Sequence, residues 1–391
     1  MGKAIGHIRE ENGVKITQYL EEHLRAASAL AGKFAEKAGL PLSGRLMGLL
    51  HDFGKYSKQF QDYIKSAEDL LDQDHDDYLD PKAAKGKIDH STAGAQHIWR
   101  HYRRKTEAAP YAQILALGIA SHHSGLIDCL HPEGGSGFSR RMDKEDAKTH
   151  YDECLSAWEP VMAEDSRQLL DTGILKELHH CDIGISKRAG KLLPADVSDE
   201  DKGDSENSRE VQRGLVARFL LSCLLDADRI NSAEFDDPRY KDLRARIPRR
   251  PWPRLIARLE DHLAGIEPAN PIDDLRRDIS ARCRERAADS QGLFTLTVPT
   301  GGGKTLASLR FALHHAQEHG LDRVIYVIPY TSIIDQNAKV AREILEKDEE
   351  PGTIVLEHHS NILPSKEKET WTQKLLADNW EAPIVFTTMV Q

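Results

Sequence analysis

The sequence predicts a multidomain chain in which an all-α domain is followed by an α/β lobe with a parallel sheet. The chain has 391 residues, enough for two to three domains, and a globular balance of 39% hydrophobic and 30% charged residues. From residue 15 to about 195, apolar residues recur at helical spacing, as in Ile16, Leu20 and Leu24. After residue 292, short apolar runs alternate with amphipathic stretches, a pattern typical of βαβ units.

The domain boundaries follow from composition. The all-α domain is predicted over 1–235. It includes a solvated, mobile loop at 196–210, a segment with seven acidic and two basic residues. Helix returns at 211–231 and is assigned to the core of this domain because its apolar face is wide. Residues 236–291 hold six prolines and a basic stretch, which indicates a connector. The remaining lobe, 292–391, is expected to contain strands at 293–298, 323–328, 353–356 and 383–388.

Charge and cysteine usage exclude several classes of protein. The net charge of −10 gives no general attraction to nucleic acid or anionic lipid, so any such binding must use local patches. The five cysteines form no C-x-x-C pair, which argues against a disulfide framework or a zinc knuckle and favours a reducing cytoplasm. We expect no membrane association, because no stretch reaches the roughly 18 to 20 apolar residues that a spanning helix needs.

A glycine-rich segment predicts phosphate binding at 299–305 (PTGGGKT), between a predicted strand and a predicted helix. Glycines let backbone N–H groups converge on phosphate oxygens, while Lys304 would neutralise phosphate charge and Thr305 would ligate Mg²⁺. Val298 occupies the usual position of the first glycine of this motif, and a plain glycine-rich turn is the alternative interpretation. The predicted nucleotide-binding residues are Thr300, Gly301, Gly302, Gly303, Lys304 and Thr305.

Histidine and aspartate predict a metal site in the first domain. Eleven of the nineteen histidines fall in residues 1–150, and His51 and Asp52 stand side by side after an apolar helical run. Nitrogen and oxygen donors without cysteine favour Mn, Fe, Co, Ni or Mg over structural zinc. The candidate ligands are His23, His51, Asp52, His90, His122, His123 and one of Asp226 or Asp228.

Several of these residues have a structural alternative. His23 neighbours Leu20 and Leu24 and could be a satisfied core histidine. The His122-His123 pair ends an apolar helix, where a cation also complements the helix C-terminus. Lys55 could be a solvated lysine or could stabilise charge that develops on a phosphate.

The ordered motifs HDFGK (51–55), DHS (89–91), SHHSG (121–125), DADRINS (226–232) and TVPTGGGKT (297–305) carry a family resemblance. The chain resembles the CRISPR-associated helicase-nuclease of type I interference systems, in which an HD nuclease domain is fused to a superfamily-two helicase with RecA-like lobes. The resemblance implies cleavage of single-stranded DNA after recruitment by a guide-RNA surveillance complex, with DNA movement driven by ATP in the full-length parent.

The resemblance also assigns roles to residues. Asp52 and Lys55 become catalytic, with Asp52 expected to bridge two divalent ions (Mn, Ni, Co or Fe, with Mg possible). Asp228 is favoured over Asp226 because Asp-Arg-Ile-Asn-Ser matches the end of the family motif. ATP with Mg²⁺ belongs to the full-length parent. Segments that resemble helicase motif Ia and a later strand motif add four expected DNA contacts, at Thr331, Ser332, Thr387 and Thr388.

The chain departs from the family pattern near its end. Neither a DExH-like segment nor a second lobe occurs before Gln391, so we expect a fragment with a complete nuclease, an incomplete RecA-like lobe and no unwinding activity. The expected partners of this cytoplasmic monomer are single-stranded DNA and the surveillance complex. Two alternatives stay open: an HD phosphohydrolase that acts on nucleotides, and a non-catalytic docking module.

Overall fold

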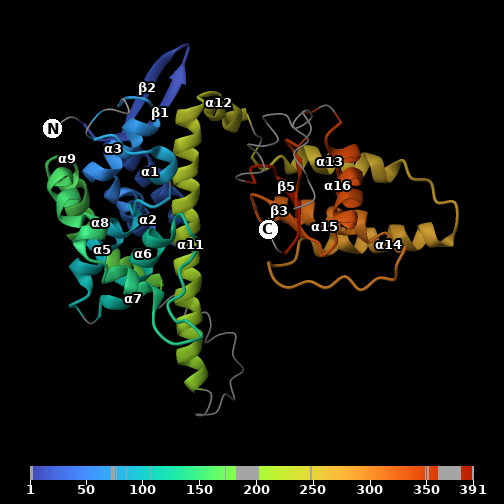
Figure 1. The fold of residues 1–391 in the computed structure, drawn as a ribbon. Helices are drawn as coiled ribbons and strands as arrows, with labels where there is room; N and C mark the ends of the chain where they lie inside the picture. The colour runs from blue at the N-terminus through green and yellow to red at the C-terminus, as the bar shows by residue number, and fades with distance from the viewer. Residues whose placement is uncertain are drawn as a thin grey trace. The chain divides into compact units, whose positions relative to one another are not determined.

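The structure is a computed structural model, and it divides the chain into two compact units, Met1–Pro238 and Arg239–Gln391 (Figure 1). The first unit is mainly helical and the second contains a parallel sheet, which confirms the predicted fold class. Among the described residues, the helices are too short or too polar to cross a lipid bilayer. The structure describes residues 3–71, 75, 77–84, 86–105, 107–171, 173–181, 202–246, 249–347, 349, 352–359 and 380–389.

The helices of the first unit surround one apolar core. The α-helices are α1 (Leu20–Ala35), α2 (Pro41–Leu50), α3 (Lys58–Ala67), α4 (Pro81–Ala84), α5 (Ser91–Tyr102), α6 (Ala109–Ser121), α7 (Gly137–Met142), α8 (Asp146–Thr149), α9 (Tyr151–Asp171) and α11 (Lys202–Asp236). Two 3₁₀ turns, η1 (Glu36–Ala38) and η2 (Phe53–Tyr56), follow α1 and α2.

Helices α1 and α2 pack almost backbone to backbone. Leu20 and Leu24, two residues of the predicted apolar stripe, are fully buried on α1. On α2, a Cβ added at Gly44 would lie 2.5 Å from the carbonyl oxygen of Ala31, and one at Gly48 would lie 2.6 Å from the Cα of Ser28. This close approach sets the distance between side chains on α1 and those that follow α2.

An N-terminal hairpin corrects the expectation of helix from residue 15 onward. Strands β1 (Ile5–Glu11) and β2 (Val14–Tyr19) pair antiparallel around Asn12 and Gly13, whose φ angles are +53° and +78°. Positive φ at both central residues is the requirement of a type I′ hairpin turn, and Asn-Gly is its preferred pair. The dipeptide was therefore the sequence signal for these strands.

Helix α11 also differs from the expectation. It begins at Lys202, so residues 202–210 are helical, which corrects the prediction of a loop there; residues 196–201 lie outside the described residues. Further along, the predicted helix at 211–231 is present, and Leu220 and Leu224 enter the core.

The second unit contains a three-stranded parallel sheet in the order β3-β5-β4, formed by β3 (Val324–Val327), β4 (Val355–His358) and β5 (Ile384–Thr387). Its helices are α12 (Arg239–Arg246), α13 (Trp252–Ala264), α14 (Pro271–Arg286), α15 (Lys304–Glu318) and α16 (Thr331–Leu345). The predicted strand at 293–298 is not a strand: this stretch pairs with no strand among the described residues, and Leu293 is 96% exposed.

The segment predicted as a connector contributes to the core of the second unit. Trp252, Leu255 and Leu259 of α13 are buried in one cluster with residues of α15 and α16. The Trp252 indole also donates a hydrogen bond to the carbonyl of Leu321 at 2.7 Å. Prolines in the first turns of α13 and α14 are compatible with helix, because the first turn has no internal acceptor for their missing N–H.

Candidate metal centre

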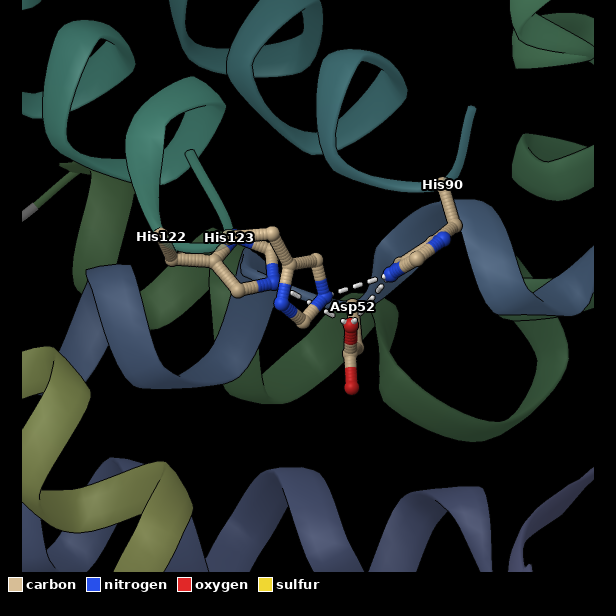
Figure 2. Close-up of side chains that lie close together, drawn as sticks. All are labelled: Asp52, His90, His122 and His123. Atoms are coloured by element: carbon tan, nitrogen blue, oxygen red, sulfur yellow. Dashed lines mark hydrogen bonds and ion pairs between the residues drawn. The ribbon is translucent and has the colours of Figure 1, made fainter. Parts of the chain in front are cut away.

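Five histidines and two aspartates converge in the first unit from segments far apart in sequence. They form two groups, and within each group the candidate ligand atoms lie within 4.8 Å of one another. The deep group contains His23, His51, Asp52 and Asp228, and the outer group contains Asp52, His90, His122 and His123 (Figure 2). Asp52 belongs to both groups, so one carboxylate connects two potential cation sites.

The deep group lies between α1, the end of α2 and α11. His23 Nε2 is 3.5 Å from Asp52 Oδ2 and 3.4 Å from Asp228 Oδ1. His51 Nε2 is 3.3 Å and 3.6 Å from the same two oxygens. The two ring nitrogens are 3.2 Å apart, and both histidine side chains are fully buried. Two nitrogens and two carboxylate oxygens therefore face a common centre.

The outer group uses the second oxygen of Asp52. His122 Nε2 lies 3.5 Å and His90 Nε2 3.7 Å from Asp52 Oδ1, while His90 Nε2 and His123 Nε2 are 2.6 Å apart. His90 precedes the first residue of α5, and the histidine pair follows α6, so helix ends position these rings (Figure 2). His123 is exposed, which leaves this group open on one side.

Hydrogen bonds on the far side of the rings fix their orientation. The Nδ1–H groups of His51, His90 and His122 donate to the carbonyls of Gly48 (2.9 Å), Ile88 (3.2 Å) and Ile119 (2.7 Å). The Nδ1–H of His23 donates to Asn231 Oδ1 at 2.7 Å. Because these hydrogen bonds engage Nδ1, Nε2 is the nitrogen that each ring directs toward Asp52 and that is placed to bind a metal ion.

Electrostatics in the deep group favour positive charge. Burial would raise the pKa of Asp52, but Lys55 and His51 outweigh burial and hold it well below its usual range. Burial likewise would raise the pKa of Asp228, but hydrogen bonds from His23 and His51 lower it. Burial lowers the pKa of His51, yet the two carboxylates raise it to about 10. A divalent cation satisfies the same attraction.

Two buried polar atoms show that the site fits a metal. Asp52 Oδ1 and His122 Nε2 are both buried without a hydrogen-bond partner, and they face each other at 3.5 Å. Burying polar atoms without partners is costly, and a cation between them would remove that cost. A donor set that consists of nitrogen and oxygen atoms suits Mn, Fe, Co, Ni or Mg.

Lys55 is a buried partner of Asp52 in this structure. It follows Asp52 in η2, and its ammonium lies 2.7 Å from Asp52 Oδ2 while its side chain is 10% exposed. Close packing holds this turn in place: a Cβ at Gly54 would lie 2.3 Å from the carbonyl oxygen of His90. The solvated-lysine alternative therefore does not describe this residue.

The structure also separates the residues that sequence spacing could not. His23 lies within the deep group despite its apolar neighbours. Asp228 faces the same group, whereas Asp226 is exposed and belongs to neither group. Sequence reasoning missed His7, whose ring centre is 4.7 Å from that of His23 in an edge-to-face contact. Its only local signal was its place before the Asn-Gly turn.

In the second unit, the glycine-rich loop precedes α15 as predicted, but the strand expected before the loop is not formed. Gly301 and Gly303 have φ angles of +84° and +77°, which side chains disfavour, and Gly303 caps the helix. The loop lines a cavity of about 540 Å³ together with Lys304, Thr305 and Arg276. Thr305 donates to Asn337 Oδ1 at 3.0 Å, and Arg276 donates to the Gly301 carbonyl at 2.8 Å.

The four expected DNA-contact residues follow two neighbouring parallel strands. Thr331 and Ser332 begin α16 after β3, Thr387 is the last residue of β5, which pairs with β3, and Thr388 follows β5. Ser332 is exposed, and Thr331 and Thr388 are half-buried. Thr387 is only 1% exposed, so its hydroxyl is not accessible to DNA at the protein surface, which corrects the expectation for this residue.

The fold and the donor set define an HD-type metal-dependent hydrolase domain joined to a helicase-like α/β unit. Comparisons agree: residues 15–187 match the family model of the Cas3 HD domain, and residues 278–391 match that of DEAD/DEAH box helicases. The CRISPR-associated nuclease/helicase Cas3 of Haloferax volcanii is 24% identical over 377 residues, which cover 88% of this chain. The match to the Cas3 HD domain, the helicase match that follows it and the similarity to a curated Cas3 confirm the predicted recognition.

The chain spans 38% of the length of the Haloferax relative. Among solved structures, T. fusca Cas3-ATP and T. fusca Cas3-ADP are each 16% identical to the chain. The structural alignments include 99% and 100% of this chain and 43% and 44% of the two Cas3 chains, with TM-scores of 0.46 and 0.45. Likenesses of this degree carry no argument about the site.

Proposed function

We propose that the first unit is a metal-dependent nuclease that hydrolyses single-stranded DNA in type I CRISPR interference. The single observation that carries this proposal is the position of Asp52, which offers one oxygen to each of two histidine-rich groups. Two cations held close together can stabilise both the attacking and the leaving oxygen of an in-line displacement at a phosphodiester, and a shared carboxylate would hold them close. The family match supports this interpretation.

Each residue of the centre has a defined task in this proposal. His23, His51 and Asp228 would hold one cation, and His90, His122 and His123 the other, with Asp52 between them. When bound, divalent ions lower the pKa of coordinated water and neutralise phosphate charge. Lys55 holds the Asp52 carboxylate in place and adds positive charge beside the phosphate.

Substrate access is asymmetric. The least buried donors are the exposed His123, His90 at 19% side-chain exposure and Asp228 at 17%, so a phosphate would approach across them. With a net charge of −10, the protein does not attract DNA at large. We therefore propose that a guide-RNA surveillance complex delivers the single strand to this opening.

The direct test is cleavage of end-labelled single-stranded DNA by the metal-free chain supplemented with Mn²⁺, Ni²⁺, Co²⁺ or Mg²⁺. We expect cleavage that requires an added metal and that exceeds turnover of mononucleotides and cyclic nucleotides. Preferred hydrolysis of small nucleotides would instead favour the phosphohydrolase alternative. Absence of both activities in metal-loaded protein would favour the docking module.

Metal binding is expected to stabilise the first unit. A ligand that binds only the folded state at 100 times its dissociation constant adds about 2.7 kcal/mol of stability. Thermal denaturation of chelator-treated protein, repeated with increasing Mn²⁺, should therefore show a rising midpoint. A midpoint that does not move with Mn²⁺ would contradict a metal centre in the folded protein.

For the second unit we propose nucleotide binding by residues 300–305. Replacing Lys304 with alanine removes the ammonium that would pair with the phosphates, so we expect ADP affinity to fall about 10-fold or more, equal to at least 1.4 kcal/mol. Fluorescence titration with a labelled ADP measures this change. Lys339→Ala, at an exposed helical lysine, is the control and should bind ADP as the wild type does.

We further propose that Thr331, Ser332 and Thr388 contact the DNA backbone, because hydroxyls at the ends of neighbouring parallel strands suit phosphate contacts. We propose ATP-driven movement of DNA only for longer forms of the protein.

A further inference from the structure

The N-terminal hairpin (Ile5–Tyr19) lies against the deep group of the candidate metal centre. β1 contacts α11 and α1, the helices that carry Asp228 and His23 (Figure 1). Most of the hairpin precedes residue 15, where the match to the Cas3 HD family model begins. The role of these strands is therefore to be found in this chain's own contacts.

The hairpin is held firmly in place. The side-chain amide of Gln61 donates to the carbonyl of Ile5 at 3.0 Å and to that of Lys55 at 2.8 Å, and its oxygen accepts from the Ile5 N–H at 2.8 Å. One side chain thus ties β1 to the turn that carries Lys55. The β1–β2 register shifts between Ile5 and His7, and His7 is the residue of β1 that faces the metal centre.

From β1, His7 reaches a ligand of the deep group through one serine. His7 Nε2 lies 3.4 Å from Ser232 Oγ, and this hydroxyl donates to Asp228 Oδ1 at 3.4 Å. Asp228 Oδ1 is the atom that faces His23 and His51. The ring of His7 also contacts that of His23 edge to face.

From β2, Gln18 reaches the other helix ligand through an asparagine. Its side-chain amide donates to Asn231 Oδ1 at 3.1 Å, and the same oxygen accepts the Nδ1–H of His23 at 2.7 Å. Gln18 thereby fixes the rotamer of Asn231 that receives the His23 proton. The two strands thus engage neighbouring residues of α11, and each contact ends on a ligand of the deep group.

No hydrogen bond of the same kind runs from the hairpin to His90, His122 or His123 among the described residues: His90 and His122 are oriented by backbone carbonyls. We propose that the hairpin is a positioning element for the deep group alone, acting through His7 and Gln18. Groups that orient metal ligands typically change affinity 10- to 100-fold when removed. The inference rests on the proposed metal centre.

The test is calorimetric titration of the metal-free full chain with Mn²⁺. Asp228→Asn and His123→Ala first assign the two binding events to the deep and outer groups. We expect His7→Ala and Gln18→Ala each to weaken the deep event about 10- to 100-fold and to leave the outer event unchanged. Glu10→Ala, at an exposed position of β1, should leave both events unchanged.

A conservative pair separates positioning from folding. Gln18→Glu keeps the length of the side chain but removes the N–H donor, so it should weaken the deep event as Gln18→Ala does. His7→Gln keeps a donor toward Ser232 and should recover part of the affinity. Thermal denaturation without metal monitors folding, and the Gln18 variants test the inference even where His7→Ala does not fold.

Equal weakening of both events, or wild-type affinity in Gln18→Ala and Gln18→Glu, would overturn the inference while the nuclease proposal stands. If the hairpin variants lose only the deep event but the wild type does not cut DNA, the inference stands and the proposed nuclease function fails. A wild-type chain that binds no Mn²⁺ overturns both.

Discussion

Replacing Asp52 with asparagine should reduce single-stranded DNA cleavage by at least about 100- to 1,000-fold, the scale of losing a principal electrostatic group in an active site. The variant keeps the shape of the side chain but removes the negative charge that faces His51 and His23 in one group and His90 and His122 in the other. It also leaves the buried Lys55 ammonium without its anionic partner. Initial rates measured at saturating Mn²⁺ give the change.

Two aspartates on α11 provide a matched control for this result. Asp228→Asn removes a carboxylate from the deep group and should lower both Mn²⁺ affinity and cleavage. Asp226→Asn makes the same chemical change two residues earlier, at an exposed position outside both groups, and should behave as the wild type. Unimpaired cleavage by Asp52→Asn would remove the basis of the nuclease proposal.

Replacing Gly54 with alanine should destabilise the first unit by about 1–3 kcal/mol, the usual cost of inserting atoms into a packed site. The added Cβ would lie 2.3 Å from the carbonyl oxygen and 2.6 Å from the Cα of His90. Because these are backbone atoms, the start of α5 must move, and the 3.1 Å hydrogen bond from the Gly54 N–H to His90 moves with it. Urea denaturation measures the loss of stability.

The displacement of His90 predicts a second effect, weaker Mn²⁺ binding in the outer group. Gly214→Ala is the control, since no atom lies within 4 Å of its added Cβ and alanine favours helix by about 0.5–1 kcal/mol. That variant should be as stable as the wild type or slightly more stable. If Gly54→Ala matched it in stability and Mn²⁺ affinity, the close contact with His90 would be unimportant.

Local pattern predicted the elements whose side chains alternate or repeat against a core. The helical stripe of α1 and the apolar runs at β3, β4 and β5 are examples. Local pattern failed where contacts with other segments of the chain decide the secondary structure. The run at 293–298 has strand-like residues but no neighbouring strand among those described, and residues 202–210 have loop-like composition but form the beginning of α11.

For the site, residue type and order were sufficient to select the candidate donors, because few residues other than histidine and aspartate supply nitrogen and oxygen ligands. Spacing could not choose between Asp226 and Asp228. A two-residue step on a helix turns the side chain to another face, so the way in which α11 packs decides which of the two faces the other ligands. His7 was missed because its contacts with Ser232 and His23 depend on how the hairpin lies against α11 and α1.

Residue chemistry and periodicity along the chain were sufficient to predict the resemblance to a CRISPR-associated helicase-nuclease, the two kinds of fold, the glycine-rich loop and the set of candidate metal donors. Only the folded chain shows that Asp52 faces two groups of histidines, that Asp228 rather than Asp226 lies with them, and that the hairpin hydrogen-bonds to α11 beside the deep group. These are distances between residues as many as 225 positions apart, and only the packing of helices against one another sets such distances.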